Sequence, residues 1–504
     1  MNRAARPVEI RERPWRDPLA VAAGLRRLEG PLALLSDGGT LGRWSFVAAE
    51  PDQVHVGASG AGGTLDRLRS PDFQSGVVGL LAYDAGARPA TGPRDPVWPD
   101  LMLARYPAML AFDHRAGAVR VFGRGEDPES ARAAADRAEG WLAGAIDPVV
   151  PPAPADDFVE EATPAAYCAA VGDVVERIAA GQLYQANIAR AWSGALRAGS
   201  DPFDVMLRLA GRAAAYGAFW RLGDRAVVSN SPELFLAFDP SSRRIESRPI
   251  KGTRPRHADP ADDAVLANEL RSSAKDQAEN LMIVDLMRND LSLVAEPGSV
   301  AVKALFEVES HPTVHHLVST VTGLARAGTG TAGLLEATFP PGSITGAPKH
   351  EAMKVIARHE PPRGAWCGSL FHVEDDGRLT ASVLIRTASF ERVGRRWRFR
   401  TQAGAGIVAD SDPTAELAET DAKIRALREA LVRERESREQ ADRELERALL
   451  LLRDNIAQRV GDKEAAQEEL RLHQEMWGQE EQARKAGVVE QLRSLEARNG
   501  QLER

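Results

Sequence analysis

The sequence predicts an α+β fold, because strand-like stretches come in clusters instead of alternating strictly with helices. Four stretches beyond residue 220 are rich in the β-branched and aromatic residues that strands favour. They are RAVVSNSPELFLAFD (225–239), RRIESRPIKGT (243–253), LTASVLIRTASF (379–390) and RWRFRTQAGAGIVAD (396–410). A doubly wound parallel sheet would need a helix between successive strands, so this order argues against it.

The first 147 residues predict a mostly β region with a few helices. Short apolar runs such as LALLSDGG (32–39), RWSFVAAE (43–50) and GVVGLLAYDAG (76–86) are broken by Gly and Pro, which is typical of strands joined by turns. The proline-rich segment DPVVPPAPADD (147–157) can continue neither a helix nor a central strand. We interpret it as a linker, after which a new segment begins.

Helical periodicity first stands out in TPAAYCAAVGDVVERIAAGQ (163–182). Its apolar residues recur at spacings of three and four, Thr163 is suited to cap the first turn, and Gly181 is suited to end the helix. An amphipathic helix is therefore predicted there.

Residues 428–504 predict a charged helical extension, for which a coiled coil is one form to consider. This tail contains no proline and a single aromatic residue, Trp477. A short apolar stripe is formed by Leu445, Leu449, Leu452 and Ile456. Glycines at 461, 478 and 487 interrupt the pattern, which argues against a continuous coiled coil. A solvated helix and a dimerising or docking helix both stay open.

Composition narrows the possible partners. The chain has 504 residues, 43% of them hydrophobic, and a net charge of -8, which argues against a nucleic-acid binder. No stretch has the apolar length of a membrane span or of a signal-peptide core. The two cysteines, Cys168 and Cys367, lie far apart without metal-ligand spacing, as suits a reducing compartment. We expect a cytoplasmic protein that binds small molecules or proteins, with no membrane and no nucleic acid.

The stretch SRPIKGTRPR (247–256) places an amine, Lys251, between an apolar strand residue and a Gly-Thr turn. Arg254 and Arg256 follow it closely. Clustered positive charge, together with desolvation, would favour the neutral amine, which is the nucleophilic form. A surface lysine in a basic turn is the commoner explanation of such a stretch.

Two predicted helices each carry a pair of carboxylates three residues apart, which places each pair on one helix face. The pairs are Asp276 with Glu279 and Glu416 with Glu419, and Lys423 follows four residues after the last. Oxygen ligands without a His–Cys cluster favour magnesium over zinc. An acidic first turn that stabilises the helix dipole is the competing explanation.

Three further stretches carry features that packing alone does not require. Gly404 and Gly406 would let backbone amides approach an anion closely. Thr345 and the Gly346 amide lie in a loop directly before a predicted helix, where anions bind favourably. Arg386 lies inside the apolar stretch SVLIRTASF, where an unpaired guanidinium would be costly. We expect it to meet a carboxylate of the protein or of a ligand.

Taken together, these motifs resemble those of the chorismate-utilising enzymes, which include anthranilate synthase component I, aminodeoxychorismate synthase component I, and the isochorismate and salicylate synthases. PIKGTRPR, ENLMIVDLMRNDL, ESHPTVHHLVSTVTG, FPPGSITGAPK and AGAGIVADSDPTAELAETDAK occur in the family's order, and the resemblance covers nearly all of residues 30–427. It implies an anthranilate synthase component I-like fold, with large antiparallel sheets packed as a sandwich inside outer helices. The implied segments are an N-terminal region (1–147), a chorismate-binding catalytic domain (158–427) and the charged helical tail (428–504).

The lysine distinguishes members of this family. Anthranilate synthases look like PIAGT at this point, whereas aminodeoxychorismate synthases carry PIKGT, as this chain does. The resemblance implies that Lys251 attacks C2 of chorismate as the C4 hydroxyl departs. Ammonia would then attack C4 and release the lysine, giving 4-amino-4-deoxychorismate for 4-aminobenzoate and folate synthesis. Glu233, in SPEL, matches the family's general acid and base.

Other roles follow from the resemblance position by position. Glu279, Glu416 and Glu419 match the magnesium-binding carboxylates, and Asp276 takes the place of a further acidic residue in that cluster. Mg²⁺ would bridge them to the C1 carboxylate of chorismate. The positions that match substrate-contacting or site-lining residues are Thr253, His316, Thr345, Arg386, Gly404, Gly406 and Lys423.

The sequence shows no glutaminase, because neither cysteine sits in a glycine-flanked nucleophile turn with a matching His–Glu pair. Ammonia is therefore expected from a separate glutamine amidotransferase subunit, in a heterodimer. Two alternatives stay open. One is anthranilate synthase component I or another chorismate-utilising enzyme, and the other is a non-catalytic scaffold that acts through its helical tail.

Overall fold

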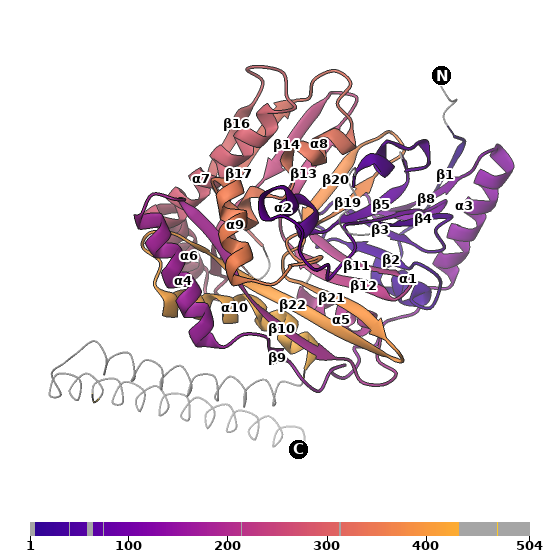
Figure 1. Ribbon diagram of the computed structural model, residues 1–504. Helices are drawn as coiled ribbons and strands as arrows, with labels where there is room; N and C mark the ends of the chain where they lie inside the picture. The colour runs from indigo at the N-terminus through magenta and orange to yellow at the C-terminus, as the bar shows by residue number, and fades with distance from the viewer. Residues whose placement is uncertain are drawn as a thin grey trace, which may run out of the picture. The chain divides into compact units, whose positions relative to one another are not determined.

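Two large antiparallel β-sheets form the body of the protein, with helices on their outer sides (Figure 1). The computed structural model describes residues 6–39, 41–57, 64–73, 75–212, 214–311, 314–432 and 471. The predicted α+β fold with sandwiched antiparallel sheets is confirmed. The predicted tail, from residue 433 onward, lies outside the described residues except for Arg471.

Among the described residues, one sheet has twelve strands and the other has ten. The twelve-stranded sheet runs in the order β1 (Val8–Pro14), β8 (Ala118–Arg124), β7 (Ala108–Asp113), β3 (Trp44–Ala48), β2 (Leu32–Leu35), β11 (Tyr216–Leu222), β12 (Arg225–Ser231), β21 (Thr387–Val393), β22 (Arg396–Ile407), β10 (Gln185–Ala195) and β18 (Gly346–Ala347), with β9 (Val159–Glu160) beside β10. The ten-stranded sheet runs in the order β15 (Ile250–Pro255), β17 (Val314–Leu324), β14 (Arg244–Arg248), β13 (Leu234–Asp239), β20 (Leu379–Val383), β19 (Ser369–Val373), β5 (Val77–Leu81), β6 (Leu101–Arg105) and β4 (Gln53–Val56), with β16 (Ala301–Ser310) beside β17.

The helices pack against these sheets. They are α1 (Pro18–Leu25), α2 (Tyr83–Thr91), α3 (Pro128–Ala143), α4 (Pro164–Ala179), α5 (Pro202–Leu209), α6 (Pro260–Ser272), α7 (Ala274–Ser292), α8 (Thr331–Thr338), α9 (Lys349–His359) and α10 (Pro413–Leu431). Within the described ranges, no helix combines the length and the apolar character needed to cross a membrane.

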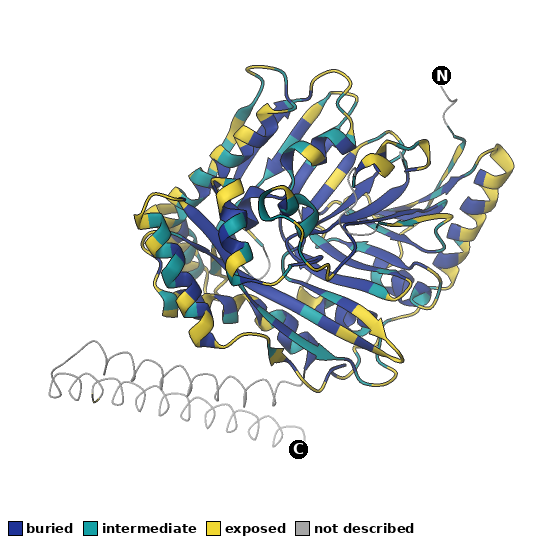
Figure 2. Cartoon of the chain, in the orientation of Figure 1, coloured by how far each residue is buried: buried dark blue, intermediate teal, exposed yellow. Residues whose placement is uncertain are grey.

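Apolar clusters hold the layers together. One cluster lies between the sheets, where Leu32 of β2 and Leu80 of β5 belong to the same packed group. A second packs the outer face of the twelve-stranded sheet against α1, α3, α5 and α10. A third packs the ten-stranded sheet against α2, α7, α8 and α9. Figure 2 shows the resulting distribution, with buried residues along the strands and exposed ones on the outer helix faces.

The helix predicted near residues 163–182 is confirmed as α4. Thr163 caps it, accepting a hydrogen bond from the Ala166 amide at 3.2 Å. Gly181 follows its end with φ of +73°, a conformation that favours glycine. The helix that carries Asp276 also begins at a polar cap, because Ser273 accepts from the Asp276 amide at 3.3 Å. Local capping chemistry thus fixes where these helices start.

Each sheet contains strands that precede the segment 147–157 in the sequence and strands that follow it. β2 pairs with β11 in one sheet, and β5 pairs with β19 in the other. Segments 1–147 and 158–427 therefore lie in one compact unit, Met1–Glu434. The boundary predicted at Leu427 falls inside α10, and Leu431 and Val432 beyond it are buried.

Two of the four predicted strand stretches are split where the chain passes from one sheet to the other. Pro232 and Glu233 join β12 of the twelve-stranded sheet to β13 of the ten-stranded sheet, and residues 384–386 return from β20 to β21. The two bends lie side by side, because β12 pairs with β21 and β13 with β20. The prediction that Arg386 lies inside a strand is wrong, since it lies in the returning bend.

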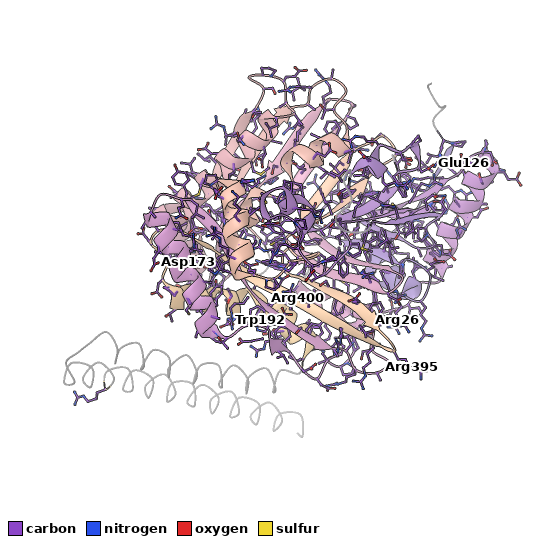
Figure 3. The ribbon with its side chains drawn as sticks, in the orientation of Figure 1. Arg26, Glu126, Asp173, Trp192, Arg395 and Arg400 are labelled. Atoms are coloured by element: carbon purple, nitrogen blue, oxygen red, sulfur yellow. The ribbon has the colours of Figure 1, made fainter. Side chains whose placement is uncertain are left out.

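β10 and β22 form a long antiparallel pair in the twelve-stranded sheet. Trp192 and Arg400, labelled in Figure 3, come from these two strands. Toward the other end of the pair, Gly406 stands opposite Asn187. Gly404 and Gly406 both lie within β22, inside the stretch 396–410 that predicts a strand, and belong to its ladder with β10.

Candidate active site

A β-bulge in β15 positions Lys251. The register between β15 and β17 shifts by one residue between Ile250 and Thr253. The extra residue is accommodated at Gly252, whose φ of +91° is a conformation that residues with side chains rarely adopt. Bulges interrupt the alternation of side chains along a strand and redirect them. The Gly-Thr turn noted in the sequence is therefore a bulge that aims the lysine.

Lys251 points across the space between the sheets toward β22. A methyl group added at Gly406 would lie 2.8 Å from the Lys251 Nζ. The lysine is half-buried. Within the part of the chain that the structure describes, its Nζ has neither a hydrogen-bond nor an ion-pair partner. An unpaired amine facing the interior is available for chemistry.

The positive charge expected beside this lysine is instead neutralised by carboxylates. Arg254 contacts Glu269 at 2.9 Å and Asp276 at 3.2 Å. Arg256 contacts Asp263 at 2.8 Å. These arginines fasten α6 and α7 to β15.

Glu233 lies in the bend between β12 and β13 and is 4% exposed. Burial raises the pKa of its carboxyl to about 7, although a hydrogen bond with Ser343 and the charges of Lys251 and Lys423 act to lower it. With such a pKa, both protonation states are populated at neutral pH. The carboxyl is therefore suited to donate a proton in one step and accept one in another.

Arg386 lies in the neighbouring bend with φ of +50°, which is unusual for a residue with a side chain. Burial lowers the pKa of its guanidinium, and the charge of Glu233 opposes that shift. No described residue makes a hydrogen bond or an ion pair with the guanidinium. The expected protein carboxylate is thus not found there, which leaves the guanidinium for an anion from outside.

His316 presents an uncharged ring to the same region. Its Nδ1 lies 2.9 Å from the Thr253 hydroxyl across the β15–β17 pair. Burial, followed by the charges of Arg386 and His311, lowers the pKa of the ring to about 3. The Nε2 atom is buried and has no partner among the described residues. The predicted site residues Thr253, His316 and Arg386 are therefore brought together.

Lys275 links the carboxylates of the two acidic helices. Its Nζ lies 4.0 Å from Glu279 on α7 and 3.9 Å from Glu416 on α10. Burial raises the pKa of both carboxyls, nearby carboxylates including Glu419 raise it further, and Lys275 acts to lower it. One carboxylate from each predicted pair, Glu279 on α7 and Glu416 on α10, thus lies beside the same ammonium.

Lys423 is held firmly beside them. It contacts Glu419 at 2.5 Å and donates to the Gly404 carbonyl at 2.9 Å. Burial by itself would raise the pKa of Glu419, but the charge and hydrogen bond of Lys423, helped by Lys251, lower it overall. Glu419 therefore stays anionic, and Lys423 ties α10 to β22.

The acidic groups have the donor chemistry that Mg²⁺ requires, although no three His, Cys, Asp or Glu side chains of the described ranges gather closely enough to hold a metal. Glu279 and Glu416 offer carboxylate oxygens and already converge on one cation, the Lys275 ammonium. Asp276 is engaged by Arg254, so it is less available than the glutamates. By the chemistry of their donor atoms, these glutamates fit a divalent cation.

The loop that carries Thr345 is a buried, hydrogen-bonded segment. The Thr345 hydroxyl donates to the Pro341 carbonyl at 2.8 Å. The backbone carbonyl of Thr345 accepts from the Asn187 amide at 2.9 Å. Gly346 has φ of +141°, and a Cβ there would lie 2.1 Å from the Gln185 carbonyl. Only glycine permits this close approach to β10. The Thr345 hydroxyl can still accept one hydrogen bond from a ligand.

Three polar residues of this region were missed by the sequence reasoning. Gln185 is fully buried, neither polar atom of its amide has a described partner, and its Nε2 would lie 2.4 Å from a Cβ at Gly406. Asn187 Oδ1, also unpartnered there, would lie 2.3 Å from a Cβ at Gly404. Nothing in a strand-like sequence marks such amides. A lysine in the first turn of a helix, where positive charge is unfavourable, could have drawn attention to Lys275.

The charge of Lys251 acts on three carboxyls that belong to different elements. It lowers the pKa of Glu233, Glu279 and Glu419. The amine, the buried acid and carboxylates of both acidic helices thus lie close enough to act on one another. A cavity of about 500 Å³ lies elsewhere, lined by β1, β3, β7, β8 and the turn after β19, and includes none of the predicted site residues.

Comparisons with known proteins agree on one family. Residues 47–429 match the chorismate binding enzyme family. Aminodeoxychorismate synthase component 1 from Klebsiella aerogenes is 41% identical over 365 residues, covering 70% of this chain and 76% of that protein. Anthranilate synthase component 1 from Streptomyces coelicolor is 37% identical over 429 residues, covering 78% and 82%. A crystal structure of anthranilate synthase component I from Streptococcus pneumoniae aligns with a TM-score of 0.67 at 26% identity, covering 76% of this chain and 92% of that one.

Proposed function

Because this chain belongs to the chorismate binding enzyme family, we propose that it is an aminodeoxychorismate synthase component 1. It would convert chorismate and ammonia to 4-amino-4-deoxychorismate. The observation that carries this choice within the family is the unpaired amine of Lys251, aimed between the sheets at Gly406. An enzyme that adds its nucleophile directly at C2 has no need of an amine there.

In the first step, Lys251 gives up its proton to solvent, and its nitrogen then attacks C2 of chorismate with the freed lone pair. The ring double bonds shift, the bond between C4 and its hydroxyl breaks, and the departing oxygen takes a proton from Glu233 to leave as water. The pKa of Glu233, raised by burial to about 7, supports this role, since an ordinary carboxyl would carry little proton at neutral pH.

In the second step, ammonia attacks C4 and the bond between C2 and the lysine nitrogen breaks. The double bonds return to their places, the lysine leaves as an amine, and Glu233 accepts the proton that the ammonia nitrogen loses. Atoms balance over the cycle, because chorismate and ammonia give 4-amino-4-deoxychorismate and water.

The chain's own charges would orient the substrate. Arg386, half-buried and unpaired among the described residues, suits a bidentate grip on the enolpyruvyl carboxylate. Thr253, His316, Thr345, Gly404, Gly406 and Lys423 would line the pocket. Glu279, Glu416 and Glu419, with Asp276 nearby, would hold Mg²⁺, which when bound neutralises these carboxylates and binds the ring carboxylate of chorismate.

Ammonia would come from a glutamine amidotransferase subunit bound to this chain. Delivery from a partner keeps ammonia from being protonated in bulk water. We further propose that the reaction takes place in the cytoplasm and supplies 4-aminobenzoate for folate synthesis. A purified chain that used glutamine alone as efficiently as ammonium would contradict the need for a partner.

Product analysis tests the proposal. The purified chain is incubated with chorismate, Mg²⁺ and an ammonium salt, and the products are identified by mass and absorbance. We expect a product that keeps its enolpyruvyl group and has gained an amine at C4, without release of pyruvate. Direct formation of anthranilate with pyruvate would overturn the assignment in favour of anthranilate synthase. Absence of any turnover with either ammonium or a glutaminase partner would favour a scaffold.

A further inference from the structure

Lys275 occupies a position that helix physics disfavours. It is the second residue of α7, in the first turn, where the helix dipole repels positive charge. Its pairing with Glu279 at i+4 has lysine on the N-terminal side, the less favourable order for such a pair. Local stability of the helix therefore does not explain a lysine here.

The contacts of Lys275 are electrostatic and loose. Its Nζ lies 4.0 Å from Glu279 and 3.9 Å from Glu416, beyond hydrogen-bond distance in both cases. The Lys275 side chain is 57% exposed, whereas those of the two glutamates are only 14% and 4% exposed. The ammonium can therefore move into solvent without breaking a hydrogen bond, and the carboxylates cannot.

Lys423 provides the contrast within the same group. It is fixed by a 2.5 Å contact with Glu419 and a 2.9 Å hydrogen bond to the Gly404 carbonyl. Lys275 and Lys423 both form ion pairs with these carboxylates, but Lys423 is held in place and Lys275 is free to leave.

The carboxylates between which Lys275 lies need a positive charge. Glu416 receives one hydrogen bond, from the Ser411 hydroxyl at 2.7 Å to the Oε1 atom, and it is buried near Glu279 and Glu419. Buried like charges destabilise one another unless a cation lies among them. α7 and α10 would repel each other at this point without one.

We propose that Lys275 is a built-in counter-ion, which holds the place of the divalent cation between Glu279 and Glu416 and gives it up when Mg²⁺ binds. The inference rests on the proposed function, since it concerns the same acidic group. Lys275 keeps the two helices in register before the metal arrives. Because the ammonium must be displaced, Lys275 also lowers the affinity for Mg²⁺. It is a positioning residue that acts through the glutamates.

Binding of the metal alone tests this role. Mg²⁺ affinity is measured by calorimetry, and Mn²⁺ affinity by electron paramagnetic resonance, on the full chain without substrate. We expect Lys275→Met to bind both ions about fivefold more tightly than the wild type, since displacement of two weak ion pairs is no longer needed. Without metal, its thermal midpoint should fall by about 2 °C, and saturating Mg²⁺ should abolish this difference.

Two further variants complete the test. Lys275→Arg keeps the charge and should keep the wild-type Mg²⁺ affinity. Lys354→Met is the matched control, because Lys354 on α9 is a 40% exposed lysine paired with Glu351 at 2.8 Å, away from the site. It should leave metal affinity unchanged. Equal or weaker Mg²⁺ binding by Lys275→Met would overturn the proposal.

The outcome is separable from that of the proposed function. Tighter metal binding by Lys275→Met in an enzyme that makes anthranilate would uphold the counter-ion and reject the aminodeoxychorismate assignment. Unchanged metal binding in an enzyme that aminates C4 would do the reverse.

Discussion

The space between the two sheets is filled in two different ways. Near β11 and β6, large side chains such as Trp220 and Tyr106 fill the space, and we call this part the closed region. The buried Trp220 donates to the Tyr106 hydroxyl at 2.8 Å, which in turn donates to the Gly30 carbonyl at 2.7 Å. Near β15 and β22 lies the open region, where Lys251 and Arg386 have no hydrogen-bond or ion-pair partner among the described residues.

The difference shows what the sandwich contributes to function. In the closed region every polar atom of the Trp220–Tyr106–Gly30 chain has a partner, so the region adds stability and has nothing to offer a ligand. In the open region, charged groups are held in place by bulges and bends with their bonding capacity unused. The experiments below test whether the two regions separate activity from stability in this way.

The largest expected effect is the loss of C4 amination in Lys251→Ala. Without the amine, the covalent route is closed, so formation of 4-amino-4-deoxychorismate should fall by about 10³-fold, on the order of 4 kcal/mol in the barrier. Any remaining chemistry should shift to C2. Product masses and rates measure this, and unchanged amination at C4 would remove the lysine from its proposed role.

Next is Glu233→Gln, which should lower kcat by about 10²-fold because the amide cannot donate the proton that the leaving hydroxyl needs. Folding measurements give the opposite sign. The carboxyl has a pKa of about 7 in the folded protein, whereas its ordinary value is 4.5. Ionisation of the buried carboxyl therefore destabilises the fold, and this destabilisation sets in as the pH rises from 4.5 and is complete above pH 7.

Glu233→Gln should therefore exceed the wild type in unfolding free energy at pH 8, by on the order of 3 kcal/mol. At pH 4.5 the difference should shrink to about 0.4 kcal/mol. Urea unfolding at the two pH values checks this, and equal stability at both would mean that the buried charge costs nothing.

In the closed region, Tyr106→Phe should act on stability alone. It leaves the Trp220 indole and the Gly30 carbonyl unpaired in a buried place, at a cost of about 2 kcal/mol in unfolding free energy. Turnover at 25 °C should match the wild type. A loss of activity without a loss of stability would break the proposed separation of the two regions.

The smallest effect is expected for Gly406→Ala. The new methyl group would lie 2.4 Å from Gln185 Nε2 and 2.8 Å from Lys251 Nζ, and both atoms are ends of flexible side chains that can shift. We expect about a fivefold fall in kcat/KM with little change in unfolding free energy. Gly140→Ala is the control, since a Cβ there would have no neighbour within 4 Å.

Local signals in the sequence were sufficient for single elements. Thr163 and Gly181 marked the ends of α4, and the short apolar runs before residue 90 became β2, β3 and β5. Such signals come from backbone chemistry within a few residues. They predicted the α+β class, and together with the family motifs they predicted the antiparallel sandwich.

What the sequence could not give depends on contacts distant along the chain. The stretches 225–239 and 379–390 look like single strands, because a change of sheet leaves no local mark in their apolar pattern. Arg386 was therefore expected inside a strand. Likewise, the partners of Arg254 and Arg256 come from α6 and α7, and only their arrangement in space shows that both arginines are paired with carboxylates.

The paired bends that carry Glu233 and Arg386 limit how the chain can vary in length during evolution. The two bends are joined by backbone hydrogen bonds, from Asn230 N to Arg386 O at 3.0 Å and from Val383 N to Glu233 O at 3.1 Å. One residue gained or lost in either bend would slide a strand past its neighbour and turn its side chains to the opposite face. Insertions and deletions among natural variants should therefore fall in surface turns such as 114–117, and should spare both bends.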